Sequence, residues 1–326
     1  MNYRRVLVTG GAGFIGSHLM DALLERGCRV NAIDDLSTGK RDNISHIQNQ
    51  ISFYHGDIRD RKLMEEAVGG CDTVFHEAAV VSVPKTVEMP VETAMVNDLG
   101  TLIVLESARK AGVRKVVLAS SCAVYGDAAR CPQDEAMHAS PKSPYAVQKL
   151  TGEQYAALYT ELYGLQTVCL RYFNVYGPRQ DSGSPYSGVI SIFLSKAVSK
   201  MTPTIFGNGE QYRDFIFVKD VVRANLLAAE SDVPSGNVYN IGTGSFVRIR
   251  QLWEMICDLA GLDIEPEFRE ARAGDIIESV AKTDRARIGL GFKPTFGFEN
   301  GLHETYDWFL KCREYGYGKE TGILEK

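Results

Sequence analysis

Short apolar runs alternate with longer stretches of helical period along the first half of the chain. The runs have the length of strands and are apolar along most of their length, as in parallel strands that helices cover on both faces. They read RVLVTG, RVNAID, ISFYHGD, TVFHEAA, KVVLASS and TVCLRYF. The pattern therefore predicts an α/β fold with a doubly wound parallel sheet of the Rossmann type.

The alternation becomes irregular after residue 173. A loop rich in glycine, proline and serine follows (NVYGPRQDSGSPYSG), yet residues 216–242 again have the pattern of a helix and a strand of the main sheet. We therefore expect residues 1–173 to form a Rossmann domain to which residues 216–242 return. Residues 174–326 are expected to form mainly a smaller, interleaved substrate domain.

Composition narrows the class of protein. A chain of 326 residues can bury a sizeable core, and its net charge of −5 argues against a nucleic-acid partner. The 7 cysteines show no C-x-x-C pairing, which predicts reduced thiols and no metal site. No apolar run has the length of a signal peptide or a membrane span. We expect a cytoplasmic protein that binds neither membranes nor nucleic acid.

Two glycine patterns overlap in the stretch VTGGAGFIGSHL. One is G-x-G-x-x-G (Gly11, Gly13, Gly16), and the other is G-x-x-G-x-x-G (Gly10, Gly13, Gly16). Both patterns predict a dinucleotide site, because the glycines allow a tight turn and the helix that begins near Phe14 offers free N–H groups to a pyrophosphate.

Asp34 lies at the end of the second predicted strand, about 20 residues beyond the glycines, where an acidic side chain binds the ribose 2′-hydroxyl. A carboxylate there would repel a 2′-phosphate, so the sequence favours NAD over NADP. Lys40 and Arg41 in the following loop leave NADP slightly open, although a solvated loop is the better explanation for them.

A tyrosine and a lysine share one face of a helix predicted to begin after Ser143. Tyr145 and Lys149 are four residues apart, which places them one turn from each other. An ammonium and a positively charged nicotinamide would stabilise the tyrosine phenolate, which could then exchange a proton with a sugar hydroxyl. The Y-x-x-x-K pattern is common by chance. Its weight comes from Ser120 and Ser121, which end a predicted strand at the sheet edge where α/β folds place their chemistry.

These motifs together resemble the extended branch of the short-chain dehydrogenase/reductase superfamily, and most closely the nucleotide-sugar 4-epimerases that act on UDP-glucose or UDP-N-acetylglucosamine. The motifs occur in family order along nearly the whole chain. They are TGGAGFIGSHL, DDLSTGKRDN, GDIRD, HEAA, SSCAVYGD, SPYAVQKL, RYFNVYGPRQ, GNGEQYRDFIFVKD, NIGTG and ARAGDI. The resemblance selects the Gly10, Gly13, Gly16 pattern.

The resemblance also implies a role for individual residues. The catalytic residues would be Ser121, Tyr145 and Lys149. NAD would contact Gly10, Gly13, Phe14, Ile15, Gly16, Asp34, Asp57, Ile58, Ala78, Ala79, Asn97, Tyr145, Lys149 and Tyr172. The UDP-sugar would contact Ser121, Tyr145, Asn174, Val189, Phe206, Arg213, Arg272 and Ser279.

The implied reaction inverts C4 of a UDP-hexose through a 4-keto intermediate. Tyr145 would take the proton of the 4-hydroxyl while the C4 hydride passes to bound NAD, and Ser121 would hold the same oxygen. A small residue at Ser279 implies acceptance of the N-acetylated pair UDP-GlcNAc and UDP-GalNAc beside UDP-Glc and UDP-Gal, unless another residue closes that pocket. The family also implies a homodimer formed through helices near residues 94–112 and 145–163.

Other functions remain as alternatives. Dehydratases and decarboxylases of the family need an acidic group two residues after the catalytic hydroxyl, and Ala123 stands there. A ketoreductase that consumes NADPH is disfavoured by Asp34. A non-catalytic dinucleotide sensor would need none of Ser121, Tyr145 and Lys149.

Overall fold

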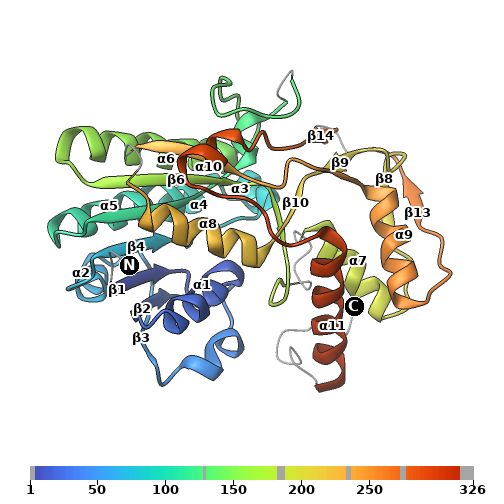
Figure 1. Ribbon diagram of the computed structural model, residues 1–326, viewed down its shortest axis with the longest axis horizontal. Coiled ribbons are helices and arrows are strands. Elements are labelled where there is room, and N and C mark those ends of the chain that lie inside the picture. The colour runs from blue at the N-terminus through green and yellow to red at the C-terminus, as the bar shows by residue number, and fades with distance from the viewer. Residues whose placement is uncertain (1–3, 128–129, 182–187, 233–235, 272–276, 316–326) are drawn as a thin grey trace.

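The computed structural model describes residues 4–127, 130–181, 188–232, 236–271 and 277–315 (Figure 1). Its centre is a sheet of seven parallel strands, so the predicted doubly wound α/β fold is confirmed. In spatial order the strands are β11 (Asn237–Ile241), β6 (Gln166–Tyr172), β5 (Lys115–Ser121), β4 (Thr73–His76), β1 (Arg5–Thr9), β2 (Arg29–Asp34) and β3 (Ile51–His55).

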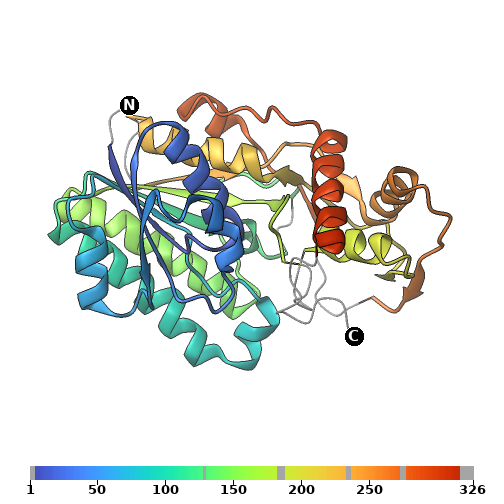
Figure 2. The ribbon, with the colours of Figure 1, turned by 90° about the horizontal axis from the view of Figure 1, so that it is seen from below.

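Helices cover both faces of this sheet (Figures 1 and 2). One face carries α1 (Phe14–Glu25), α8 (Val218–Glu230), the 3₁₀ helix η1 (Arg41–Ile47) and α10 (Asp284–Gly289). The other carries α2 (Arg61–Val68), α5 (Thr101–Lys110) and α6 (Pro144–Tyr163). The apolar runs meet both layers: Val6 and Val8 pack in the α1 and α8 layer, and Leu7 between them packs in the opposite layer.

The order of the strands places a crevice at their carboxyl ends. β1 lies between β2 and β4, and the chain winds outward from β1 in both directions, which makes this edge the usual ligand site of such sheets. The register aligns Thr9 with His76 and Ser121 with Tyr172. Residues at the ends of β1, β4, β5 and β6 therefore meet along one edge.

Short elements connect the sheet to its helices near this edge. They are α3 (Val83–Glu88), α4 (Pro90–Ala94), the π-helical turn η2 (Met95–Gly100) and the 3₁₀ turn η3 (Cys122–Tyr125).

A second unit lies beyond the carboxyl edge, at the right of Figure 1. Its helices α7 (Val189–Val198), α9 (Ile249–Ala260) and α11 (Phe298–Tyr315) pack around Phe193 and Trp253, whose ring centroids are 5.5 Å apart. Its strands are β7 (Asn174–Tyr176), β8 (Thr204–Phe206), β9 (Tyr212–Arg213), β10 (Phe215–Phe217), β12 (Val247–Arg248), β13 (Glu267–Arg269) and β14 (Glu278–Ser279). The chain visits this unit between β6 and β11, so the two units are interleaved.

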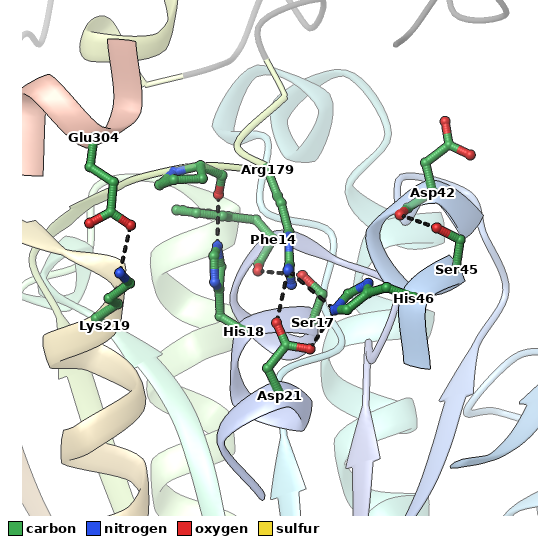
Figure 3. Close-up of polar contacts among 11 residues, drawn as sticks. Phe14, Ser17, His18, Asp21, Asp42, Ser45, His46, Arg179, Lys219 and Glu304 are labelled. Carbon is green, nitrogen blue, oxygen red and sulfur yellow. Dashed lines mark hydrogen bonds and ion pairs between the residues drawn. The ribbon is translucent and has the colours of Figure 1, made fainter. Parts of the chain in front are cut away.

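A polar seam joins α1 to the segment that follows β7 (Figure 3). We call His18, Asp21, His46, Pro178 and Arg179 the α1 seam. The Arg179 guanidinium lies 2.8 Å from one Asp21 oxygen, and His46 Nε2 lies 2.8 Å from the other. His18 Nε2 donates to the Pro178 carbonyl at 2.9 Å. The seam thus ties the start of the second unit to the first helix of the sheet.

Within the described residues, no helix has both the length and the apolar character that crossing a bilayer would require.

Candidate active site

Three glycines of the first turn pack closely together, with Gly13 and Gly16 against the carbonyl oxygen of Gly10. A Cβ on Gly16 would lie 2.1 Å from the Gly10 carbonyl oxygen, and one on Gly13 would lie 3.1 Å from it, while Gly10 itself has a φ of +68°. A Cβ on Gly11 would instead lie 2.9 Å from the Ala32 side chain, which is a packing contact with β2. The turn therefore uses Gly10, Gly13 and Gly16 for its own shape.

The turn leads directly into α1. Gly13 is the N-cap and has no side chain to cap the helix. The N–H groups of Phe14 and Ile15 lie in the first turn and therefore have no intrahelical acceptor. Backbone N–H groups and the positive end of a helix form a ready site for a pyrophosphate.

Asp34 lies beside this turn at the end of β2. Its carboxylate accepts N–H bonds from Ala12 at 2.9 Å and from Leu36 at 2.8 Å, and a Cβ on Gly39 would lie 2.6 Å from it. Burial raises the pKa of Asp34, and the two N–H bonds oppose that rise. Each oxygen retains acceptor capacity for a hydroxyl. The glycine turn, the open end of α1 and this carboxylate fit an adenine dinucleotide with free ribose hydroxyls, which is NAD.

The two residues expected near the adenine follow β3. Asp57 accepts several bonds from Arg59, including one at 2.9 Å from Nε and one at 2.6 Å from Nη2, and these bonds lower the pKa of Asp57. Ile58 is buried, and a Cβ on Gly100 would lie 2.7 Å from its Cδ1. Their contact with adenine stays a prediction.

Asn97, expected on the nicotinamide side, holds the backbone after β4. Its Oδ1 accepts from Val80 N at 2.8 Å, and its Nδ2 donates to Val80 O at 3.0 Å and to Gln148 Oε1 at 2.7 Å. Asn97 lies in η2, and π-helical turns are frequent at functional sites. It thereby fixes the segment that carries Ala78 and Ala79 and links it to α6.

The three candidate catalytic residues meet at the carboxyl edge of β5. Ser143 caps α6 through a bond from Ala146 N at 3.2 Å, which sets the start of the helix that carries Tyr145 and Lys149. The Ser121 side chain lies near the Tyr145 hydroxyl and acts to lower its pKa. Lys149 Nζ donates to the Ala119 carbonyl at 2.8 Å and lies 5.9 Å from the centroid of the Tyr145 ring.

Burial opposes charge on both residues of α6. It raises the pKa of Tyr145 to about 12, although the nearby Ser121 side chain acts in the opposite direction. It also lowers the pKa of Lys149 to about 8, and the nearby carboxylates of Glu77 and Glu153 limit that fall. A phenolate at Tyr145 therefore requires a positive charge close to its oxygen.

A buried ion pair lies beneath these residues and was not expected from the sequence. Arg171 donates to both oxygens of Glu153 at 2.8 and 2.7 Å, and the two side chains are only 6% and 5% exposed. Ser120 Oγ donates to the same carboxylate. Glu153 follows Lys149 by four residues, so the helical spacing that groups Tyr145 with Lys149 also contains Glu153.

Tyr172 ends β6 next to Ser121 in register. Its hydroxyl donates to Glu77 Oε1 at 2.8 Å and accepts from Asn225 Nδ2 at 2.8 Å. Glu77 lies in the HEAA motif, but no functional role was predicted for it from the sequence.

The residues expected on the sugar side come from the second unit. Ser279 on β14 is aligned with Arg213 on β9, and Arg213 Nη1 donates to the Tyr212 carbonyl at 2.9 Å. Ser279 is buried near the Cys122 thiol, whose pKa burial raises to about 11. The Ser279 and Ser121 side chains both act to lower that pKa, so Ser279 lies in the same part of the site as the candidate catalytic hydroxyl.

Asp214 holds these segments together. Its carboxylate accepts from Thr243 N at 2.8 Å, Thr243 Oγ1 at 2.7 Å, Gly244 N at 2.9 Å and Ala281 N at 3.1 Å. It is fully buried and follows Arg213 in the chain. Asp214 lies in the motif QYRDF, and Thr243 and Gly244 lie in NIGTG, but nothing in the spacing of these motifs indicates that they meet.

The remaining substrate residues begin or end elements of the second unit. Asn174 opens β7, and its Nδ2 donates to the Asp214 carbonyl at 3.2 Å. Val189 opens α7 and Phe206 ends β8. Arg272 lies outside the described residues.

Comparisons with known proteins agree with this geometry. Residues 6–242 match the model of the NAD dependent epimerase/dehydratase family. The UDP-glucose 4-epimerase of Mycolicibacterium smegmatis is 41% identical over 94% of this chain and 98% of its own length. A structure of the Thermotoga maritima UDP-glucose 4-epimerase with UDP-glucose has a TM-score of 0.91 at 39% identity, covering 95% of this chain and 99% of that one. The UDP-N-acetylglucosamine 4-epimerase of Methanobrevibacter ruminantium, in complex with UDP-N-acetylmuramic acid, also has a TM-score of 0.91, at 40% identity with coverages of 95% and 99%.

This chain belongs to the NAD-dependent epimerase/dehydratase family. The predictions of this family, of an NAD-dependent enzyme and of the 4-epimerase class are thereby confirmed.

Proposed function

We propose that this protein is a UDP-hexose 4-epimerase in which Tyr145 exchanges the proton of the sugar 4-hydroxyl. The observation that carries the proposal is that Tyr145 and Ser121 meet at the carboxyl edge of β5, with the Lys149 ammonium held against the adjacent Ala119 carbonyl.

Each residue has a separate task in this mechanism. The Tyr145 oxygen takes the 4-hydroxyl proton, and Ser121 Oγ holds the same sugar oxygen while its charge changes. NAD, when bound, supplies the acceptor for the C4 hydride and returns that hydride to the opposite face of the 4-keto sugar. Arg213 would anchor the diphosphate while the sugar ring turns, since guanidinium groups bind phosphates bidentately.

Ala123 supports epimerisation over dehydration or decarboxylation. Its N–H donates to Ser121 Oγ at 3.2 Å, so the residue lies within one turn of the candidate catalytic hydroxyl. A methyl group there supplies no acid or base for the carbon next to C4.

The direct test is Tyr145→Phe, which keeps the ring and removes the titratable oxygen. We expect C4 inversion to slow by about 10²–10⁴-fold, the usual contribution of a general acid–base residue. Bound NAD and the melting temperature should not change. Tyr155→Phe on the same helix is the matched control and should turn over normally. Near-normal turnover by Tyr145→Phe would contradict the proposal.

The substrate range is proposed to include N-acetylated UDP-sugars. Ser279 is a small side chain buried beside Cys122, and a large aromatic ring in its place would overpack the site, which costs about 1–3 kcal/mol or more. We expect Ser279→Tyr to abolish interconversion of UDP-GlcNAc and UDP-GalNAc while sparing UDP-Glc and UDP-Gal. If the variant keeps both activities, Ser279 does not control the substrate range.

We further propose a homodimer formed through residues 94–112, which include η2 and α5, and through α6; η2, α5 and α6 pack side by side. Large apolar side chains are exposed along η2, α6 and the adjoining α4. They are Val91, Met95, Val147, Leu158, Leu162 and Tyr163. An apolar surface of this kind usually marks a protein interface. Sedimentation should show a dimer for the wild type and a monomer for Val91→Glu combined with Leu162→Glu; a monomeric wild type would contradict the proposal.

A further inference from the structure

Glu77 places a carboxylate at the edge of the sheet where the candidate catalytic residues meet. It directly follows β4, and its N–H donates to the Thr9 carbonyl at 3.2 Å. The Tyr172 hydroxyl donates to Glu77 Oε1 at 2.8 Å and is itself fixed by Asn225 from α8. The position of the carboxylate is therefore set from both β6 and α8.

Lys149 reaches the same part of the edge from the opposite layer. Its Nζ is held by the Ala119 carbonyl on β5. The β4–β5 register aligns His76 with Leu118, so Glu77 and Ala119 are the next residues on strands that run about 4.8 Å apart. The charge of Lys149 lowers the pKa of Glu77, and the charge of Glu77 raises the pKa of Lys149.

The other titratable groups around Lys149 do not supply the negative charge that Glu77 supplies. Glu153 faces Lys149 from the same helix, but Arg171 already neutralises it through two hydrogen bonds. Cys169 on β6 has its pKa raised well above the usual value by burial, and burial keeps His76 on β4 neutral by lowering its pKa to about 3. Burial raises the pKa values of Tyr145 and Tyr172, and the charge of Glu77 raises both further.

We propose that Glu77 is a positioning residue for the 4-epimerase reaction, and that its carboxylate keeps Lys149 charged against the Ala119 carbonyl beside Tyr145. The proposal rests on the proposed function for its effect on turnover. Glu77 acts through Lys149 and needs no contact of its own with the sugar.

The proposal makes activity depend on pH in a defined way. Burial raises the pKa of Glu77 to about 7 and lowers that of Lys149 to about 8. Below about 7 the carboxylate is protonated, but Lys149 then stays charged without its help. Above about 8 the lysine loses its proton. The kcat profile should therefore fall on the alkaline side of this window.

Glu77→Gln tests the proposal, because the amide keeps an acceptor for the Tyr172 hydroxyl and removes only the charge. The pKa of Lys149 should fall by about one unit, so kcat at pH about 9 should drop about tenfold below that of the wild type. At pH about 6, where wild-type Glu77 is already protonated, the two proteins should agree within about threefold. Glu77→Asp keeps the charge and should restore part of the alkaline activity.

Two further variants separate this role from a structural one. Glu135 is also a partly buried carboxylate with a raised pKa, and it accepts from Asn240 N at 2.7 Å. Glu135→Gln should leave the alkaline limb of the profile in place. Tyr172→Phe removes the hydrogen bond that lowers the pKa of Glu77, so the Glu77 carboxyl should lose its proton only at higher pH.

The deciding measurement is the ¹³Cε NMR titration of Lys149 in lysine-labelled holoenzyme, with the signal assigned by Lys149→Arg. A midpoint that falls in Glu77→Gln and stays in place in Glu135→Gln supports the proposal. An unchanged midpoint, or a loss of kcat that is uniform across pH, overturns it. If the wild type inverts no UDP-sugar, the proposed function fails instead, and the titration still decides whether Glu77 holds the charge of Lys149.

Discussion

Two clusters of charged residues in this protein have almost the same ion-pair distances and very different surroundings. In the buried cluster beneath α6, Arg171 lies 2.7 Å from Glu153, and both side chains are at most 6% exposed. In the α1 seam, Arg179 lies 2.8 Å from Asp21, with side chains 20% and 24% exposed (Figure 3). The comparison shows that distance alone does not determine the energetic weight of an ion pair.

Water explains the difference. Removing a partner from a buried pair leaves a charge with no solvent to stabilise it, whereas water replaces a lost partner at the surface. For the same reason, burial shifts the pKa values of Glu77, Tyr145 and Lys149 beside the buried pair, where they affect the chemistry. The seam mainly fixes the position of a loop.

The largest expected effect comes from breaking the buried pair. Arg171→Met leaves the Glu153 carboxylate buried without a countercharge and should lower the free energy of unfolding by about 3–5 kcal/mol. Urea unfolding followed by circular dichroism measures this loss. Adding Glu153→Leu removes the orphaned charge and should recover much of it. A loss below about 1 kcal/mol in the single variant would show that the pair behaves like a surface pair.

A loss of stability of intermediate size is expected at acidic pH, and one histidine of each region contributes to it. Burial lowers the pKa of His76 to about 3 and that of His18 in the seam to about 4, from a usual value of 6.5. The unfolded chain therefore binds these protons first, and stability is lost as the pH falls below 6.5.

His18→Gln tests the contribution of the seam. Between pH 7 and pH 5 the variant should lose about 1–2 kcal/mol less stability than the wild type. The rest of the acid-induced loss should remain, because His76 is unchanged in the variant. Melting temperatures at pH 7 and pH 5 give the comparison. An identical fall in the variant and the wild type would mean that His18 is not shielded from water.

The smallest effect is expected from Asp21→Asn. Because Asp21 and Arg179 are partly solvated, the loss of their ion pair should cost less than about 1 kcal/mol, and added salt should shrink the difference further. Urea unfolding at low and high salt measures both. A cost above about 2 kcal/mol would remove the contrast between the two clusters.

The sequence predicted those features that depend on local spacing. The apolar runs define the parallel strands, and four-residue spacing places Tyr145 and Lys149 on one helix face. Contacts between residues that are distant in the chain were not predicted. Glu77 contacts Tyr172 at a separation of 95 residues, and Asp214 contacts Ala281 at a separation of 67. Such contacts depend on which strand ends become neighbours, and a single motif does not encode that. The fixing of Val80 by Asn97 likewise depends on how η2 packs.

The central claim is that C4 is inverted by a hydride that never leaves the active site. The most direct measurement incubates the purified protein in D₂O with UDP-GlcNAc, UDP-GalNAc, UDP-Glc or UDP-Gal, without added NAD, and follows the products by proton NMR. We predict the C4-inverted sugar with protium retained at C4, because the hydride is returned from bound NAD. Deuterium at C4, or no inversion of any of these sugars, would contradict the account.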